Sequence, residues 1–139
     1  MKVIMCIDER NGLMFNNRRI SRDSKVTEDI ITMLDKRSLM LQIKSYSKIL
    51  FENYPERIII NDELPSIDTT DWQFIEDDEL IGFENNLEEI ILYNWNRHYP
   101  SDKKLQLELQ SINWELVSQV DFIGNSHNTI TKFVYTRKK

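Results

Sequence analysis

The sequence predicts one α/β domain built on a mixed β-sheet. In the first half, apolar runs typical of buried strands alternate with segments of helical periodicity, which is typical of a parallel sheet with helices packed on it. Near the C-terminus, two long extended runs are joined by GNSHNT, which predicts an antiparallel pair. The length of 139 residues suits a single core. We therefore expect residues 1–139 to form a single domain.

The first half supplies the parallel part of the sheet. Residues 2–7 are rich in Val, Ile and Met and predict a buried strand, followed by a long connection over 8–23. Apolar residues spaced at i, i+4, i+7 and i+8 predict an amphipathic helix over 24–35, capped by Asp23 or Ser24. The further elements expected here are strands over 39–43 and 57–61 and a helix over 45–54 that Pro55 stops.

The second half completes the sheet. We expect a short strand over 72–76, a short helix over 79–87 and an apolar strand over 89–95. The two long extended runs cover 114–123 and 130–137. No internal repeat, linker or low-complexity segment divides the chain.

Charge is strongly segregated along the chain. Residues 58–96 contain no Lys or Arg but eleven acidic residues, whereas the rest of the chain has 18 basic residues against 12 acidic ones. A phosphate-bearing ligand is therefore repelled by the first region and attracted to the second. The single cysteine, Cys6, excludes an internal disulfide framework and is expected to be a small core residue. No apolar run reaches membrane-spanning length, and we expect a cytoplasmic protein.

Four segments together carry a resemblance to a known family. VIMCIDERNGLMF is followed by a helix, by the strand and helix of LMLQIKSYSKIL and by RIII; EEIILYNWNRHYPSD and WELVSQVDFIGNSHNTITKFVYTRKK follow later. In these segments and in their order the whole chain resembles the dihydrofolate reductases. The resemblance implies a three-layer α/β fold with a central mixed sheet and C-terminal antiparallel strands.

The resemblance implies an active-site carboxylate, and here the chain departs from the family. The reductases place a Pro-Trp segment before the first helix, with a buried carboxylate that assists proton delivery to the pterin; this chain has RRISRDSKVTED instead. Asp23 lies closest to the expected place of the carboxylate, and a buried carboxylate with a raised pKa would handle a proton. The alternative is that Asp23 only caps the helix.

The resemblance also implies an NADPH site, which is degenerate in this sequence. Where the family has Gly-Arg-x-Thr to hold phosphate, only Lys44 and Ser45 are suitable. Acidic residues follow the third strand, and the paired-glycine turn of the family is reduced to Gly82. Ordinary NADPH binding is therefore disfavoured, and we expect no cofactor.

Two dense stretches are candidate ligand sites. In FNNRRISRDS, Asn16 and Asn17 favour a turn with positive φ, and three arginines can clamp a phosphate or carboxylate: Arg18, Arg19 and Arg22. The alternative is a solvated loop that pairs with the acidic middle region or with a second copy of the chain.

The second stretch, YNWNRHYPSD, offers aromatic rings for stacking and amides for reading the edge of a planar ligand, and its candidate residues are Tyr93, Asn94 and Trp95. The alternative is that the aromatic residues pack at the end of a strand. The only histidines, His98 and His127, stand in unrelated contexts, and we expect no metal site.

Three functions follow from these patterns. The first is a divergent relative of the reductases, without ordinary NADPH-dependent activity, that binds an anionic small molecule or a protein partner through the Arg-rich loop. The second is an NADPH-dependent reductase of a pterin-like substrate. The third is an RNA-associated module, which the net charge of −5 disfavours. We expect no association with a membrane, and the sequence does not determine the oligomeric state.

Overall fold

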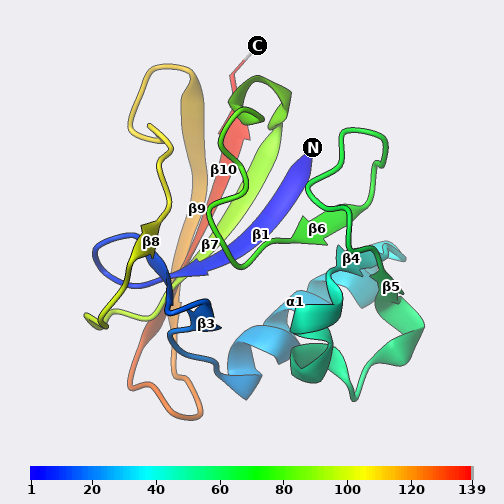
Figure 1. The fold of residues 1–139 in the computed structure, drawn as a ribbon, viewed down its shortest axis with the longest axis horizontal. Coiled ribbons are helices and arrows are strands. Elements are labelled where there is room, and N and C mark those ends of the chain that lie inside the picture. Colours follow the sequence, from blue (N-terminus) through cyan, green and yellow to red (C-terminus); the bar gives the residue numbers. More distant parts are fainter. Residues whose placement is uncertain (139) are drawn as a thin grey trace.

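The computed structural model describes residues 1–138 and is built around one twisted seven-stranded sheet (Figure 1). The strand order is β5-β4-β6-β1-β7-β10-β9, and only β10 runs antiparallel to its neighbours. The bounds are β1 Lys2–Ile7, β4 Leu41–Ile43, β5 Ile58–Ile60, β6 Trp72–Phe74, β7 Glu89–Asn94, β9 Trp114–Phe122 and β10 Ile130–Arg137. The mixed sheet with a C-terminal antiparallel pair is thus confirmed.

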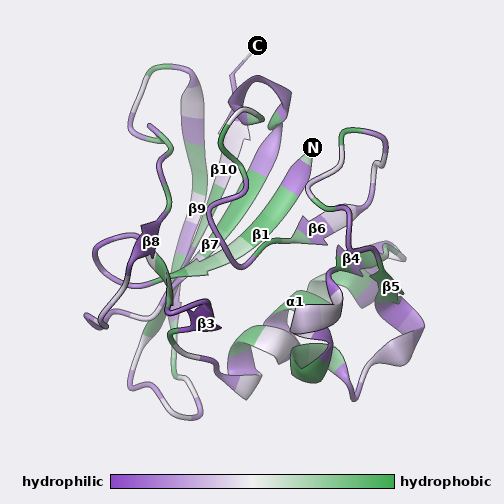
Figure 2. Ribbon diagram, in the orientation of Figure 1, coloured by the Kyte–Doolittle hydropathy of each residue, from purple (hydrophilic) through white to green (hydrophobic). Residues whose placement is uncertain are grey.

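The central strands are buried on both faces because apolar residues occupy both sets of alternating positions. Val3 and Met5 of β1 point into one core, whereas Ile4 between them points into the other. β7 follows the same alternation, with Ile90 and Ile91 on opposite faces. Much of β1 and β7 is coloured as hydrophobic in Figure 2.

The α-helix α1, Ser24–Arg37, covers one face of the sheet (Figure 1). It begins at Asp23, whose side chain accepts from the Lys25 N–H, and it ends at Ser38, which adopts a left-handed conformation. Its buried residues include Ile30 and Leu34, which pack against the strands of that face. The helix is therefore fixed at both ends and along one side, and its N-terminus lies at the edge of the sheet where the cleft forms.

The opposite face is covered by loops and a small sheet. Leu64, Leu80 and Leu105 come from connecting segments and fill this core. The small antiparallel sheet has the order β3-β2-β8, with bounds β2 Gly12–Phe15, β3 Arg18–Arg19 and β8 Lys103–Lys104. The connection predicted over 8–23 thus holds two short strands, which fix the Arg-rich segment in place.

Two predicted helices differ from those in the structure. The helix expected over 45–54 is a 3-10 helix, η1 Ser45–Phe51, followed by a 3-10 turn, η2 Pro55–Arg57. η1 has no side-chain cap at its N-terminus, and Pro55 prevents its continuation. The helix expected over 79–87 is only the 3-10 turn η3 Glu84–Asn86, because Gly82 adopts a φ of 90° and interrupts any helix there.

Within residues 1–138, no helix is long and apolar enough to cross a membrane.

Candidate functional site

A cleft lies where the carboxyl ends of the parallel strands meet, which is the usual ligand-binding edge of an open α/β sheet. Three of its cavities matter here: a polar mouth between α1, η1 and the β9–β10 turn, a narrow inner cavity and a third cavity beyond β6. Their volumes are about 330, 20 and 270 Å³ respectively. The inner cavity shares Arg22, Asp23, Thr27 and Leu50 with the mouth, so the two adjoin.

The Asp23 carboxylate is buried between the mouth and the core. One oxygen, Oδ1, accepts from the N–H groups of Lys25 at 2.9 Å and Asn125 at 2.8 Å. The other, Oδ2, accepts from the Ser126 N–H at 2.8 Å and contacts His127 Nδ1 at 2.9 Å. Burial raises the pKa of Asp23, but these donors outweigh it and lower the pKa well below its usual range.

Asp23 is therefore an ionised anchor at neutral pH in this structure. The sequence led us to expect a carboxylate with a raised pKa if Asp23 delivered a proton, and the direction of its shift is the opposite. It does cap α1, which was the alternative expectation. It also holds the β9–β10 turn against the start of the helix, a contact between residues 104 positions apart.

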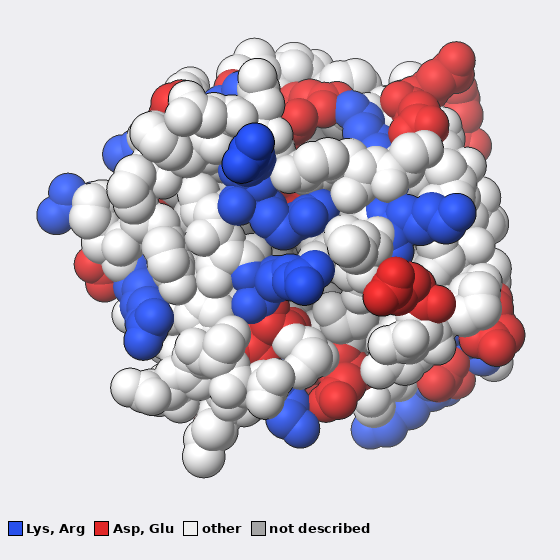
Figure 3. All heavy atoms as spheres, turned by 60° about the horizontal axis from the view of Figure 1, so that its bottom comes forward, with Lys and Arg blue, Asp and Glu red and all other residues white. Residues whose placement is uncertain are grey.

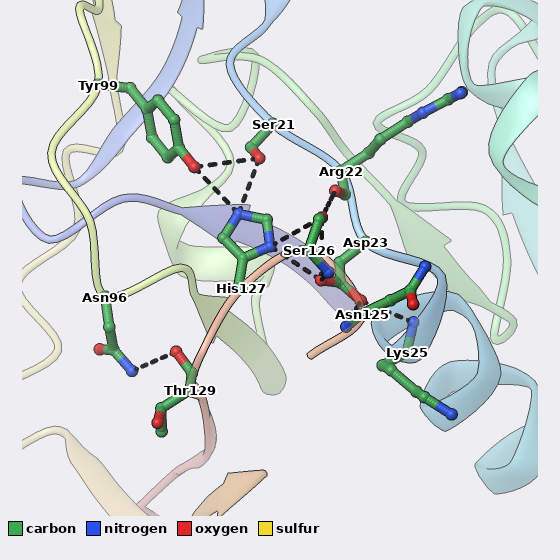
Figure 4. A network of polar contacts seen from close by, with 10 residues as sticks. All are labelled: Ser21, Arg22, Asp23, Lys25, Asn96, Tyr99, Asn125, Ser126, His127 and Thr129. Atoms are coloured by element: carbon green, nitrogen blue, oxygen red, sulfur yellow. Dashed lines mark hydrogen bonds and ion pairs between the residues drawn. The ribbon is translucent and has the colours of Figure 1, made fainter. Parts of the chain in front are cut away.

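His127 forms the centre of a polar network that the sequence did not lead us to expect (Figure 4). Its side chain is 2% exposed and stacks on the Trp95 ring at a centroid distance of 4.6 Å. Asp23 faces Nδ1 on one side of the imidazole, while Ser21 and Tyr99 face Nε2 on the other. The Nε2 distances are 2.9 Å to Ser21 Oγ and 3.0 Å to the Tyr99 hydroxyl.

Two glycines and a second aspartate make this network possible. A Cβ atom on Gly124 would lie 2.7 Å from Asp23 Oδ2, so only glycine lets the turn approach the carboxylate. Asp8 is fully buried and accepts from the N–H groups of Gly12 at 2.7 Å and Tyr99 at 3.0 Å. It thereby holds the segment that carries the Tyr99 hydroxyl, and a Cβ on Gly12 would collide with it.

Arg22 borders the polar mouth of the cleft. Within residues 1–138 its guanidinium forms no hydrogen bond or ion pair, and its side chain extends away from the His127 network (Figure 4). The other polar groups of the mouth are Ser24, Thr27, Asn53, Asn125 and Ser126. Figure 3 brings forward the end of the molecule with β3 and the start of α1, and Lys and Arg side chains gather across the middle of that face. The mouth thus combines the unpaired Arg22 cation and neutral hydrogen-bonding groups with the Asp23 carboxylate, whose oxygens are held by N–H donors.

The remaining arginines of the loop have different environments. Arg19 forms a bidentate pair with Glu76, with both N···O distances at 2.8 Å, and lies 4.4 Å from the centroid of the Tyr46 ring. This is a pairing of the Arg-rich loop with the acidic middle region, within one chain. Arg18 is exposed on β3. Asn17 has a φ of 59° and borders the third cavity, so its predicted turn conformation is present.

A carboxylate occupies the donors at the start of η1. The Ser45 N–H and hydroxyl donate to the two oxygens of Asp62, each at 2.7 Å. These are the donors that the resemblance assigned to a cofactor phosphate. The Lys44 ammonium bonds both carboxylate oxygens of Glu79. Both residues expected to hold a cofactor phosphate therefore bind acidic side chains of the chain itself.

The third cavity carries further negative charge. Glu76, Asp77 and Glu79 all border it, together with Lys44 and Lys103. Burial and the neighbouring Glu79 raise the pKa of Asp77 to about 6, and its Oδ1 atom is buried without a hydrogen-bond partner in the described part of the chain. Three carboxyl groups of the acidic region noted in the sequence thus line the third cavity.

The aromatic stretch after β7 is split between the core and the cleft. Tyr93 is buried beneath α1, where its hydroxyl donates to Asp29 Oδ2 at 2.6 Å. Asn94 accepts from the Asn96 N–H at 2.8 Å. Of the three predicted ligand-binding residues here, only Trp95 borders the inner cavity. Cys6, expected in the core, is half-buried and borders the same cavity.

Sequence reasoning missed Ser21, Tyr99 and His127 as a group. The sequence held one signal, the glycine that precedes the histidine by three positions in GNSHNT and lets the turn approach closely. Neither the burial of His127 nor the proximity of the three residues was visible, because they come from three separate segments. Among residues 1–138, no cluster of three or more His, Cys, Asp or Glu side chains has the arrangement needed to hold a metal ion.

Comparison with known proteins identifies the fold. No protein-family model matches the chain, and no curated protein matches its sequence. Among solved structures, the chain is similar to a dihydrofolate reductase from Enterococcus faecalis complexed with NADP(H) and RAB-propyl, with a TM-score of 0.59 and 12% identity. The similarity covers 100% of this chain and 97% of the other. The chain therefore has the dihydrofolate reductase fold, as its resemblance led us to expect.

Proposed function

We propose that this chain is a divergent protein of the dihydrofolate reductase fold that binds an anionic small molecule at the mouth of the cleft and has no ordinary NADPH-dependent reductase activity. The observation that carries this proposal is the distribution of charge between the two larger cavities. Carboxylates occupy the side where a nucleotide phosphate would bind, whereas an unpaired guanidinium stands at the mouth.

The acidic side supports the loss of NADPH binding. A cofactor phosphate at Ser45 would have to displace Asp62, and it would then meet Glu79 and Asp77 nearby. Like charges that lie a few ångströms apart at a protein surface repel by several times the thermal energy, and salt weakens this repulsion. The resemblance to the reductases implies that the cofactor phosphates bind in this region, so the charge on this side opposes the cofactor.

The mouth supports the binding of an anion. Arg22 is free to form two parallel hydrogen bonds to a carboxylate or phosphate. The Asp23 carboxylate nearby keeps its negative charge, but its oxygens are directed at the N–H groups of Lys25, Asn125 and Ser126, so they are not available to pair with Arg22. The side chains of Ser24, Asn53 and Asn125 add neutral donors around a volume of about 330 Å³. We infer that a small acid with more than one charged oxygen fits best.

The test is calorimetric titration of the full chain with NADPH, citrate and inorganic pyrophosphate. Arg22→Ala is the variant, and Arg37→Ala is the matched control, since it removes the same charge at the far end of α1, roughly 20 Å away. We expect no saturable NADPH binding at millimolar concentration. At least one of the two anions should bind, and Arg22→Ala should weaken it about tenfold or more, whereas Arg37→Ala should not.

Two results would overturn the proposal. Saturable NADPH binding near micromolar, with oxidation of NADPH in the presence of dihydrofolate, would establish a reductase. Equal losses in Arg22→Ala and Arg37→Ala would mean that any anion binding follows net charge rather than a site at the mouth.

A further inference from the structure

We propose that Ser21, His127 and Asp23 form a hydrolytic triad that cleaves esters of small acyl groups, with the Tyr99 hydroxyl stabilising the oxyanion. The three side chains have the connectivity that such a site needs. Ser21 Oγ lies 2.9 Å from His127 Nε2, and His127 Nδ1 lies 2.9 Å from Asp23 Oδ2. Ser21 borders the inner cavity, and Asp23 borders both the inner cavity and the mouth.

The contacts of Asp23 fix the tautomer of His127. Backbone N–H groups of Lys25, Asn125 and Ser126 all donate to the carboxylate, so it serves as an acceptor. His127 Nδ1 must then carry the proton that it donates to Oδ2. Nε2 then carries the lone pair and faces the hydroxyls of both Ser21 and Tyr99, so it accepts the Ser21 proton as a general base when the Tyr99 hydroxyl turns toward the substrate. Stacking on Trp95 holds the plane of the ring.

Tyr99 is placed to act on the developing oxyanion. Its hydroxyl lies 3.3 Å from Ser21 Oγ and 3.0 Å from His127 Nε2. When Ser21 attacks an ester, the negative charge develops on the carbonyl oxygen of that ester, and a hydroxyl this close to Ser21 Oγ can turn to donate to that oxygen. Tyrosine is one of the side chains that serve in oxyanion holes. Asp8 anchors the Tyr99 backbone and keeps this donor in position.

The reaction balances with water as the only co-reactant. Ser21 Oγ attacks the ester carbonyl carbon, and its proton passes to His127 Nε2. The tetrahedral intermediate expels the alcohol, which takes that proton, and an acyl-Ser21 ester remains. A water molecule then attacks the acyl carbon and gives a proton to Nε2. Ser21 leaves with this proton, which releases the acid and restores the starting state.

The cavities indicate the class of ester. The inner cavity of about 20 Å³ is bordered by Val26, Phe74 and Trp95, so it accepts an apolar acyl group about the size of acetyl. The remainder of the substrate must point to the mouth, toward Arg22. The preference for esters with an anionic leaving group rests on the proposed anion-binding function. The role of Ser21 as the nucleophile does not depend on that function.

The first experiment uses an alkyl fluorophosphonate, which reacts with activated serine hydroxyls, and intact-mass and peptide mass spectrometry. The wild-type chain should gain one adduct at Ser21. Ser21→Ala should gain none, and Ser118→Ala, a serine on β9, should react like the wild type. Asp23→Asn should react at least about 100-fold more slowly than the wild type, because its amide stabilises the wrong histidine tautomer. Circular dichroism checks that each variant is folded.

The second experiment compares phenyl acetate with 4-carboxyphenyl acetate. We expect turnover of both by the wild type, with loss in Ser21→Ala and His127→Gln. Arg22→Ala should lower kcat/KM about tenfold more for the anionic ester than for the neutral one. Absence of an adduct at Ser21, or turnover that survives Ser21→Ala, would overturn the triad. Equal effects of Arg22→Ala on both esters, with labelling of Ser21 intact, would overturn the anion site and leave the triad standing.

Discussion

Replacement of Asp23 gives the sharpest measure of how the cleft is held together. Asp23→Ala removes the helix cap, which costs about 1 kcal/mol. It also leaves the buried N–H of His127 without a partner, which costs about 1–3 kcal/mol more. Loss of the hydrogen bonds from the N–H groups of Asn125 and Ser126 costs about 0.5–1 kcal/mol each, because these groups are partly solvated. We therefore expect the free energy of unfolding to fall by about 3–6 kcal/mol, with a Tm lower by roughly 10–20 °C.

The matched variant is Asp23→Asn, because the two carboxylate oxygens have different partners. Its amide oxygen can still accept from Lys25 and Asn125, as Oδ1 does now. The amide nitrogen would take the place of Oδ2 and face the donors of Ser126 and His127. The expected loss is about 1–3 kcal/mol, clearly less than for alanine.

Urea unfolding at pH 7, followed by tryptophan fluorescence, measures both variants. A loss below about 1 kcal/mol for alanine would mean that solvent already satisfies these donors. Equal losses for the two variants would contradict the separate roles of the two oxygens.

The difference in the free energy of unfolding between the wild type and Asp23→Ala should also depend on pH. Because the folded-state pKa of Asp23 is lowered, its stabilisation is present above about pH 4 and is lost as the pH falls further.

Three further predictions concern other groups of the cleft. Asp77→Asn should raise the free energy of unfolding by roughly 1 kcal/mol at pH 7 and leave it unchanged near pH 4. The reason is that the raised pKa of about 6 makes ionisation of Asp77 costly only in the folded state. Urea titrations at both pH values measure the difference. Cys6 should resist Ellman's reagent at pH 8 until the protein is unfolded, because burial and then Glu76 raise the pKa of its thiol. Gly124→Ala should cost about 1–3 kcal/mol in urea unfolding, since its Cβ would press on Asp23 Oδ2.

Much of the fold was readable from local patterns. The apolar run at 2–7 became β1 with the predicted bounds, because a strand buried on both faces needs apolar residues at consecutive positions. The helix start at Ser24 was also predicted, since the cap and the apolar stripe agree there. The predictions of helices at 45–54 and 79–87 were wrong, because periodicity alone does not distinguish an α-helix from 3-10 turns in short segments.

The site was predictable only in part. The sequence singled out Arg22 and Asp23, but it assigned Arg19 to a ligand, whereas the structure pairs it with Glu76. It also predicted that Lys44 and Ser45 were all that remained of a phosphate site. It could not show that Asp62 and Glu79 already occupy their donors, because those contacts cross from one loop to another.

By itself the sequence determined the local structure and the electrostatic character of this protein. Strand alternation, the helix cap and the segregation of acidic from basic residues are all properties of neighbouring positions in the chain. Only the tertiary structure decided which polar side chains meet. Strand order brings the turn at 124–127 against the start of α1 and lets Asp8 hold Tyr99 over His127. A hydrogen bond depends on distances of a few tenths of an ångström, and local periodicity contains no such information about residues more than a hundred positions apart.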